Sequence, residues 1–119
     1  MHALIVEDDL TFREYLAELL KGKGFEVTAA TDGVRGYELS QKNQYDVFII
    51  DVRMPLVLGT ELAQALKQER PAARIILISG FADAGLRRAA ADLGVALLSK
   101  PFSAAQFLDL IDRTVVGHA

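Results

Sequence analysis

The chain has 119 residues, of which 51% are hydrophobic, so we expect residues 1–119 to form a single domain with a core large enough for a sheet covered by helices. A net charge of −3 argues against direct nucleic-acid binding, which depends on a basic patch, and the absence of cysteine excludes disulfides, thiolate metal sites and a cysteine nucleophile. The chain has neither a basic leader nor an apolar segment of membrane-spanning length, which predicts a cytoplasmic protein with no membrane partner.

Short apolar runs alternate along the chain with segments whose apolar residues recur at helical spacing. Strands are expected at residues 3–6, 25–29, 47–50, 74–78 and 95–98. The run at 47–50 is typical of a central strand buried on both faces of a parallel sheet. The helical segments lie at residues 10–20, 34–39, 62–66, 83–93 and 103–115. Gly22 and Gly24 are expected to end the first helix, Gly94 to end the fourth, and Ser103 to cap the fifth. Strict alternation of five strand–helix pairs predicts a doubly wound α/β fold with helices on both faces.

Polar side chains follow four of the five predicted strands. Glu7 and Asp8 follow the first strand, Asp51 the third, Ser79 the fourth and Lys100 the fifth. Because the carboxyl ends of parallel strands meet at one edge of the sheet, we expect these side chains to converge. Three carboxylates at close range repel one another and raise one another's pKa values, so a positive charge is expected among them.

The chemistry of this set points to a metal ion and a phosphoryl group. Oxygen ligands without histidine or thiolate suit a hard cation, and an open site favours Mg²⁺ or Mn²⁺ over Ca²⁺. Lys100 can bind one phosphoryl oxygen while the metal binds another, and Ser79 can hydrogen-bond a third. These roles predict phosphoryl transfer to Asp51, whose product is an acyl phosphate.

Four motifs in order along essentially the whole chain resemble those of the receiver domains of two-component response regulators. They are an acidic motif at residues 4–8, a phosphoacceptor motif at 51–55, a hydroxyl motif at 78–80 and a lysine–proline motif at 100–102. The resemblance implies the flavodoxin-like (βα)5 fold, with a five-stranded parallel sheet in the order 2-1-3-4-5. It also implies a cis peptide between Lys100 and Pro101.

The resemblance assigns a role to each motif residue. Asp51 would be the phosphorylated aspartate, with Ser79 and Lys100 completing the catalytic set. The metal ligands would be Asp8 directly, Glu7 mainly through water, the Asp51 carboxylate and the main-chain carbonyl of Arg53. The phosphoryl donor would be a histidine kinase or a histidine phosphotransfer protein, and the domain would catalyse its own phosphorylation and autodephosphorylation without being an enzyme for other substrates.

Several positions depart from the family pattern. Leu97 stands where an aromatic switch residue is expected, so ring rotation cannot relay phosphorylation, and Leu58 replaces the acid often found before the glycine. Arg53 and Phe81 occupy the positions that control access of the hydrolytic water, and we hypothesise that they slow loss of the phosphoryl group. An unknown output partner is expected at residues 83–115, on a protein that is a monomer or a weak dimer.

Other functions have distinct sequence requirements. A phosphatase of the haloacid dehalogenase type needs an acid where Arg53 stands, and a flavodoxin-like cofactor carrier needs a hydroxyl- and glycine-rich loop where residues 7–9 are acidic. A receiver used as a phosphorylation-independent adaptor is a further alternative. Asp9 is expected to cap the first helix rather than bind metal. With no output domain expected after residue 116, the chain is expected to be a stand-alone receiver or a fragment of a longer regulator.

Overall fold

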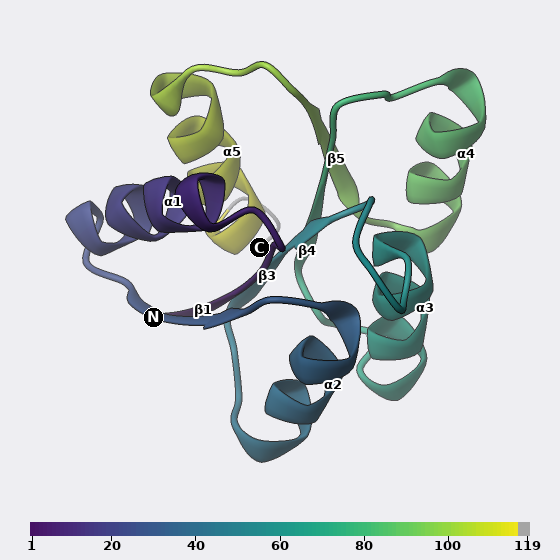
Figure 1. Ribbon diagram of the computed structural model, residues 1–119, viewed down its shortest axis with the longest axis horizontal. Helices are drawn as coiled ribbons and strands as arrows, with labels where there is room; N and C mark the ends of the chain where they lie inside the picture. The colour runs from purple at the N-terminus through teal and green to yellow at the C-terminus, as the bar shows by residue number, and fades with distance from the viewer. Residues whose placement is uncertain (117–119) are drawn as a thin grey trace.

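The computed structural model describes residues 1–116, in which strand and helix alternate along the chain (Figure 1). The strands are β1 (His2–Val6), β2 (Glu26–Ala30), β3 (Val47–Asp51), β4 (Ile75–Ser79) and β5 (Ala96–Ser99). The helices are α1 (Leu10–Gly22), α2 (Gly33–Lys42), α3 (Gly59–Glu69), α4 (Ala84–Leu93) and α5 (Ala104–Val116). The predicted (βα)5 alternation is confirmed, and each end of every predicted strand lies within one residue of the observed end.

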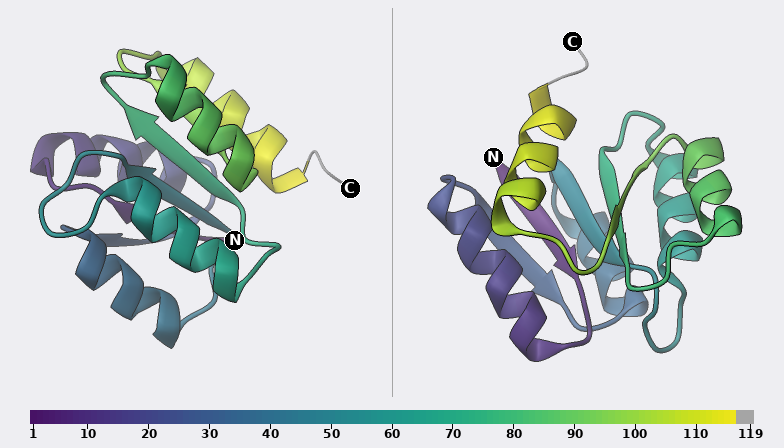
Figure 2. Two further views of the ribbon diagram at one scale, coloured as in Figure 1. Left: turned by 90° about the vertical axis from the view of Figure 1, so that its right-hand side faces the viewer. Right: turned by 90° about the horizontal axis from the view of Figure 1, so that it is seen from above.

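The strands form one parallel sheet in the order β2-β1-β3-β4-β5, as predicted. Helices α1 and α5 cover one face of the sheet, and α2, α3 and α4 cover the other (Figures 1 and 2). Since β1 pairs with both β2 and β3, the direction in which the sheet grows reverses at β1. The carboxyl ends of β1 and β3 therefore border the switch point, where doubly wound sheets bind their ligands.

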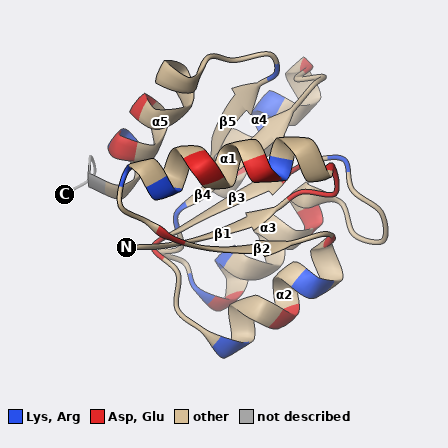
Figure 3. Cartoon of the chain, turned by 60° about the vertical axis from the view of Figure 1, so that its left-hand side comes forward, with Lys and Arg blue, Asp and Glu red and all other residues tan. Residues whose placement is uncertain are grey.

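Alternate residues of the strands supply two separate apolar layers. One layer packs under α1 and α5 and includes Ala3, Ile5, Val47, Ile49, Ile76, Ile78, Leu16, Leu20, Phe107 and Ile111. The other packs under α2, α3 and α4 and includes Leu4, Val6, Phe48, Ile50, Ile75, Leu77, Leu39, Leu62, Leu66 and Ala90. Charged residues of both signs lie on the outer surface of α1 and α2 (Figure 3). Within residues 1–116, no helix has the length and apolar character needed to cross a membrane.

The predicted helix boundaries rest on local backbone chemistry. Gly24 and Gly94 have φ angles of 92° and 73°, in the left-handed region that glycine tolerates best. Ser103 caps α5, because its Oγ accepts a hydrogen bond from the backbone N–H of Gln106 at 3.0 Å. In turn, the backbone N–H of Ser103 donates to Gln106 Oε1 at 2.7 Å. These bonds fix the point at which the chain enters the last helix.

Gly59 begins α3 directly behind the end of β3. A Cβ atom at this position would lie 2.2 Å from the carbonyl oxygen of Asp51 and 2.7 Å from the Cα of Val52, so the backbone itself would have to move. We expect Gly59→Ala to lower the free energy of unfolding by about 3 kcal/mol, measured by urea denaturation. Gly22→Ala is the matched control, since a Cβ there meets nothing within 4 Å. An equal loss of stability in both variants would contradict this expectation.

Candidate functional site

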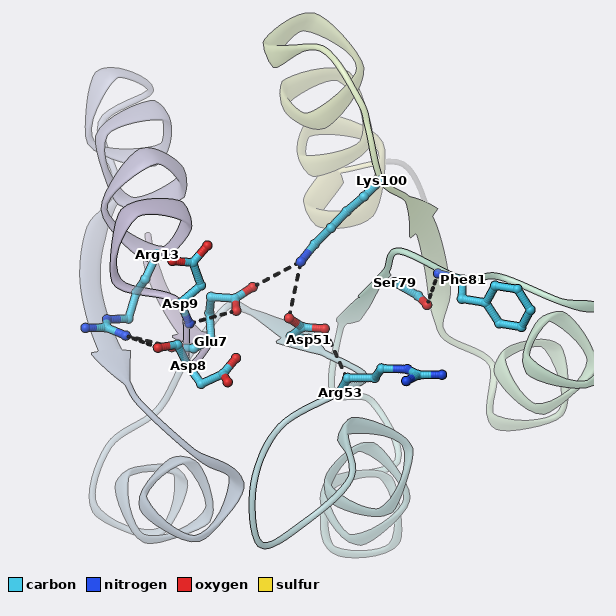
Figure 4. A network of polar contacts seen from close by, with 9 residues as sticks. All are labelled: Glu7, Asp8, Asp9, Arg13, Asp51, Arg53, Ser79, Phe81 and Lys100. Atoms are coloured by element: carbon cyan, nitrogen blue, oxygen red, sulfur yellow. Dashed lines mark hydrogen bonds and ion pairs between the residues drawn. The ribbon is translucent and has the colours of Figure 1, made fainter.

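Three predicted site residues continue the side-chain alternation of the sheet face covered by α1 and α5. In β1, β3 and β5 every second residue packs towards these helices, and Glu7, Asp51 and Lys100 are the next positions in that alternation. The parallel register brings the ends of these strands to the same edge. Their side chains consequently point towards one another (Figure 4).

Lys100 forms ion pairs with two buried carboxylates. Its Nζ lies 3.3 Å from Asp51 Oδ2 and 3.7 Å from Glu7 Oε1. The backbone N–H of Arg53 donates to Asp51 Oδ1 at 3.1 Å, which holds the other carboxylate oxygen. Asp51 is 7% exposed and Glu7 is 2% exposed, whereas the Lys100 side chain remains 31% exposed. One ammonium group thus faces two acids at the open edge of the core.

The acidic cluster fits a hard divalent cation. Glu7, Asp8 and Asp51 each offer a carboxylate oxygen, and these oxygens lie within 4.8 Å of one another. The buried Glu7 Oε1 has no hydrogen-bond partner among residues 1–116, although a buried polar atom without a partner is costly. All three donors are oxygens, the ligand type that Mg²⁺ prefers. A cation at this cluster would give Glu7 Oε1 a close partner and offset the repulsion between the acids.

The environment of Glu7 is strongly unfavourable for its charge. Burial raises the pKa of Glu7 to about 8, and the neighbouring Asp51 carboxylate adds to the rise. The backbone N–H of Asp9, which donates to Glu7 Oε2 at 3.1 Å, and the Lys100 ammonium oppose the rise only in part. Without a bound cation, Glu7 therefore holds its proton well above the usual range of a carboxylic acid.

At pH 8 without metal, we expect the free energy of unfolding of Glu7→Gln to exceed that of the wild type by roughly 1–3 kcal/mol. The folded wild type binds a proton on Glu7 between its ordinary pKa of 4.5 and about 8, and the unfolded chain does not. The free energy of unfolding must therefore fall as the pH rises through this window, and glutamine removes that loss.

Urea denaturation in the presence of a chelator, across the same pH window, measures the effect of Glu7→Gln. Asp9→Asn is the control, because Asp9 is an exposed acid of the same loop and should follow the wild type. Parallel pH profiles for the wild type and Glu7→Gln would contradict the expectation.

Asp9 does not cap α1 through its side chain, so that prediction is wrong. Asp9 occupies the N-cap position with an extended backbone, but its carboxylate makes no capping hydrogen bond. Its backbone N–H instead donates to the Glu7 carboxylate, and the guanidinium of Arg13 donates to the Glu7 carbonyl oxygen at 2.8 Å. The loop is organised around Glu7, which leaves the Asp9 carboxylate in solvent (Figure 4).

Ser79 lies at the end of β4 beside Asp51, but its hydroxyl group is engaged elsewhere. Ser79 Oγ accepts a hydrogen bond from the backbone N–H of Phe81 at 2.9 Å, on the side away from Asp51 (Figure 4). The Ser79 carbonyl accepts from the backbone N–H of Lys100 at 2.8 Å, which ties the ends of β4 and β5 together. The structure therefore brings Glu7, Asp8, Asp51 and Lys100 together and leaves Ser79 beside them, one side-chain rotation away.

The remaining predicted positions surround this cluster. A pocket of about 580 Å³, open to solvent, is lined by Asp8, Arg53 and Leu58 among others. The peptide between Lys100 and Pro101 is cis, as the resemblance implies. Leu97 pairs with Leu77 of β4 and packs with the apolar layer under α2, α3 and α4. The aliphatic side chain at this position is thus half-buried against the core under these helices.

Two residues of α1 that the sequence did not single out contact the site. Arg13 braces the backbone of the acidic loop, and the ring of Phe12 lies 4.4 Å from Lys100 Nζ. Neither residue belongs to a strand-end motif, and Phe12 looks like any apolar residue in the first turn of a helix. Arg13 reaches the loop from the first turn of α1, and Phe12 lies near Lys100 because its ring packs on Phe102, which follows β5.

Residues 3–112 match the family described as the response regulator receiver domain. The chain belongs to this family. The matched residues run from β1, which precedes Glu7, into α5, which follows Lys100, and so include every residue of the site. Receiver domains are signalling domains, and Mg²⁺ binding at an acidic site is a general feature of the family. Membership of the receiver family rules out the two alternative functions considered from the sequence, a phosphatase of the haloacid dehalogenase type and a flavodoxin-like cofactor carrier.

Relatives of this receiver domain are bacterial signalling proteins. A response regulator receiver protein of Anaeromyxobacter sp. (strain Fw109-5) is 38% identical over 108 residues, which are 90% of this chain and 45% of that protein. The receiver protein CpdR of Brucella abortus is 31% identical over 115 residues, 96% of each chain. The chain spans about half the length of the first of these relatives.

The fold also matches that of solved receiver structures. The chemotaxis protein CheY4 of Vibrio cholerae superposes with a TM-score of 0.89 at 27% identity, over 95% of this chain and 97% of that protein. The non-phosphorylated receiver domain of HemR from Leptospira biflexa gives a TM-score of 0.91 at 27% identity, over 97% of this chain and 94% of that one. The sheet order and the placement of the five helices are therefore those of the family.

Proposed function

We propose that this receiver domain accepts a phosphoryl group on Asp51 from a histidine kinase or a histidine phosphotransfer protein. The observation that supports this most strongly is the position of the Asp51 carboxylate. It is buried at the open edge of the sheet, 3.3 Å from the Lys100 ammonium and next to two further acids. A buried carboxylate beside other carboxylates does not stabilise the fold, so a chemical role accounts best for its position.

In the proposed reaction, a carboxylate oxygen of Asp51 attacks the phosphorus atom of a phosphohistidine. A phosphorus–oxygen bond forms while the phosphorus–nitrogen bond breaks, and the imidazole leaves with the electron pair and takes a proton from solvent. The Lys100 ammonium moves from the Asp51 carboxylate to a phosphoryl oxygen. The Ser79 hydroxyl rotates away from the Phe81 N–H and donates to a second oxygen. The product is an aspartyl phosphate.

The acidic cluster would hold the metal ion in this proposal. The carboxylates of Glu7, Asp8 and Asp51 and the main-chain carbonyl of Arg53 would bind Mg²⁺, and Mn²⁺ could replace it. When bound, the ion offsets negative charge on the transferring phosphoryl oxygens. The buried Glu7 Oε1, which accepts no hydrogen bond, supports this assignment, since a cation is the simplest partner for it.

The same site would end the signal by hydrolysis. Water attacks the phosphorus atom, the acyl phosphate bond breaks, and Asp51 and inorganic phosphate are released. Arg53 and Phe81 lie next to Asp51 and Ser79, and Phe81 is 65% exposed. We propose that these two side chains slow the approach of water and so lengthen the life of the phosphorylated form.

The output surface is proposed to be residues 83–115, in a cytoplasmic protein that is a monomer or a weak dimer and whose residues 1–119 are one domain. This region contains α4, β5 and α5, and Arg87 and Arg88 make the outer side of α4 basic. With Leu97 at the family's aromatic position, the signal would pass by repacking of an aliphatic side chain. The response would go to a separate partner protein or to a further domain of a longer regulator, without direct contact with nucleic acid or membrane.

Intact-mass spectrometry after incubation with acetyl phosphate tests the proposal. We expect a single phosphoryl adduct when Mg²⁺ is present and none when the ion is chelated. A folded protein that forms no adduct in either condition would contradict the proposal and favour the phosphorylation-independent adaptor.

A further inference from the structure

We infer that Phe12 is a positioning residue for Lys100, whose ammonium group it holds against the face of its ring, above Asp51. Lys100 Nζ lies 4.4 Å from the centroid of the Phe12 ring, well inside the range in which a cation is attracted to the face of an aromatic ring. The consequence for phosphoryl transfer rests on the function proposed above.

Lys100 needs such a support because its side chain is flexible and partly in solvent. Its side chain is 31% exposed, and a lysine stem loses considerable rotamer entropy when it is confined to one arrangement. The ion pair to Glu7 is long, at 3.7 Å. The Phe12 ring adds a third attraction from the side of α1. The ring carries no net charge, but its electron-rich face attracts the ammonium group.

Phe12 is itself fixed by a chain of aromatic contacts. Its ring meets Phe102 at 5.7 Å between centroids, in an edge-to-face arrangement with an angle of 68°. Phe102 stacks on Phe107 at 5.9 Å, and Phe107, a residue of α5, is fully buried against the sheet. These geometries are favourable for aromatic pairs. The position of the Phe12 ring is thus set by the core and not by the site.

Among the contacts of the Lys100 ammonium group in residues 1–116, the ring is the one that the proposed chemistry leaves unchanged. Asp51 would become an acyl phosphate, and Glu7 belongs to the proposed metal site, so both carboxylates change their interaction with the ammonium. An aromatic ring neither takes up a proton nor binds Mg²⁺. Phe12 can therefore keep Lys100 at the mouth of the site while its anionic partner changes from carboxylate to phosphoryl oxygen.

The rate of phosphorylation by acetyl phosphate at saturating Mg²⁺ tests this role. Phe12→Leu keeps an apolar side chain but removes the ring, and it should slow the reaction about two- to fivefold. Phe12→Tyr keeps the ring and should restore the rate. Phe25→Leu is the matched control, because Phe25 packs on the same apolar layer without contacting Lys100, and its rate should equal that of the wild type.

A double-mutant cycle separates positioning from packing. In a Lys100→Gln background, Phe12→Leu should have no further effect on the rate, because the ring then has no ammonium to hold. An equal slowing by Phe12→Leu in both backgrounds, or none in the wild-type background, would overturn the inference.

Proton NMR of the unphosphorylated protein gives a readout that does not depend on activity. We expect the Hε protons of Lys100 to be shifted upfield by the ring of Phe12, and this shift to disappear in Phe12→Leu and persist in Phe12→Tyr. A Lys100 signal at the same position in wild type and Phe12→Leu would overturn the inference even if Asp51 is phosphorylated. Absence of phosphorylation with the shift present would contradict the proposed function and leave the positioning contact established.

Discussion

Asp51→Asn should take up no phosphoryl group from acetyl phosphate under conditions in which the wild type is modified. The amide has nearly the same shape as the carboxylate and keeps an oxygen for the Arg53 N–H, which now donates at 3.1 Å. It lacks the nucleophilic oxygen, so the adduct should fall to background. The variant should remain folded, since it removes one of the mutually repelling charges of the cluster. Intact-mass spectrometry and circular dichroism measure the two expectations.

Asp9→Asn is the matched control for Asp51→Asn. Asp9 belongs to the same acidic edge, but its side chain is exposed and makes no capping bond. It should form the adduct at the wild-type rate. A phosphoryl adduct on Asp51→Asn of the same size as on the wild type would show that another residue accepts the group.

Lys100→Gln should slow phosphorylation by about 10²–10³ at saturating Mg²⁺, the usual cost of removing one group that stabilises developing negative charge. Glutamine keeps part of the side-chain length but cannot offset the charge on a phosphoryl oxygen. The affinity for Mg²⁺ should not fall, because the loss of a cation next to Glu7 and Asp51 makes the cluster more negative. Initial rates of adduct formation over a range of Mg²⁺ concentrations measure both quantities.

Lys23→Gln serves as the control for Lys100→Gln. Lys23 is a partly exposed lysine whose Nζ lies 3.0 Å from the Asp112 carboxylate, in an ion pair between the end of α1 and α5. Its removal should leave the rate unchanged. If Lys100→Gln and Lys23→Gln react equally fast, the proposed role of Lys100 is wrong.

The strands could be predicted because their signal is local. Apart from β2, each is a short run of apolar side chains followed by a polar or turn residue, and such a run has few alternatives in a chain of this length. The helical spacing was a less exact guide to which residues of a helix are buried. Leu10 and Tyr15 recur at helical spacing with the buried leucines of α1, yet they are 57% and 41% exposed. Spacing alone does not say how wide a stripe of the helix the sheet covers.

The site could be predicted where strand ends define it and not where a helix contributes to it. Glu7, Asp51 and Lys100 converge because strand alternation and parallel register bring them together. The contact of Phe12 with Lys100 depends on how α1 packs, and the bond from the Phe81 N–H to Ser79 depends on a single rotamer. Neither contact can be predicted from the spacing of residues along the chain.

Reduction of the phosphorylated protein with borohydride, followed by peptide mass spectrometry, tests the central claim most directly. An aspartyl phosphate is an activated acyl group, so borohydride converts the modified aspartate to homoserine. We predict this conversion at residue 51 only, in protein treated with acetyl phosphate and Mg²⁺, and not in protein treated with chelator. Conversion at Asp8 or Asp9, or a stable phosphoryl group on Ser79 with residue 51 unchanged, would contradict the account.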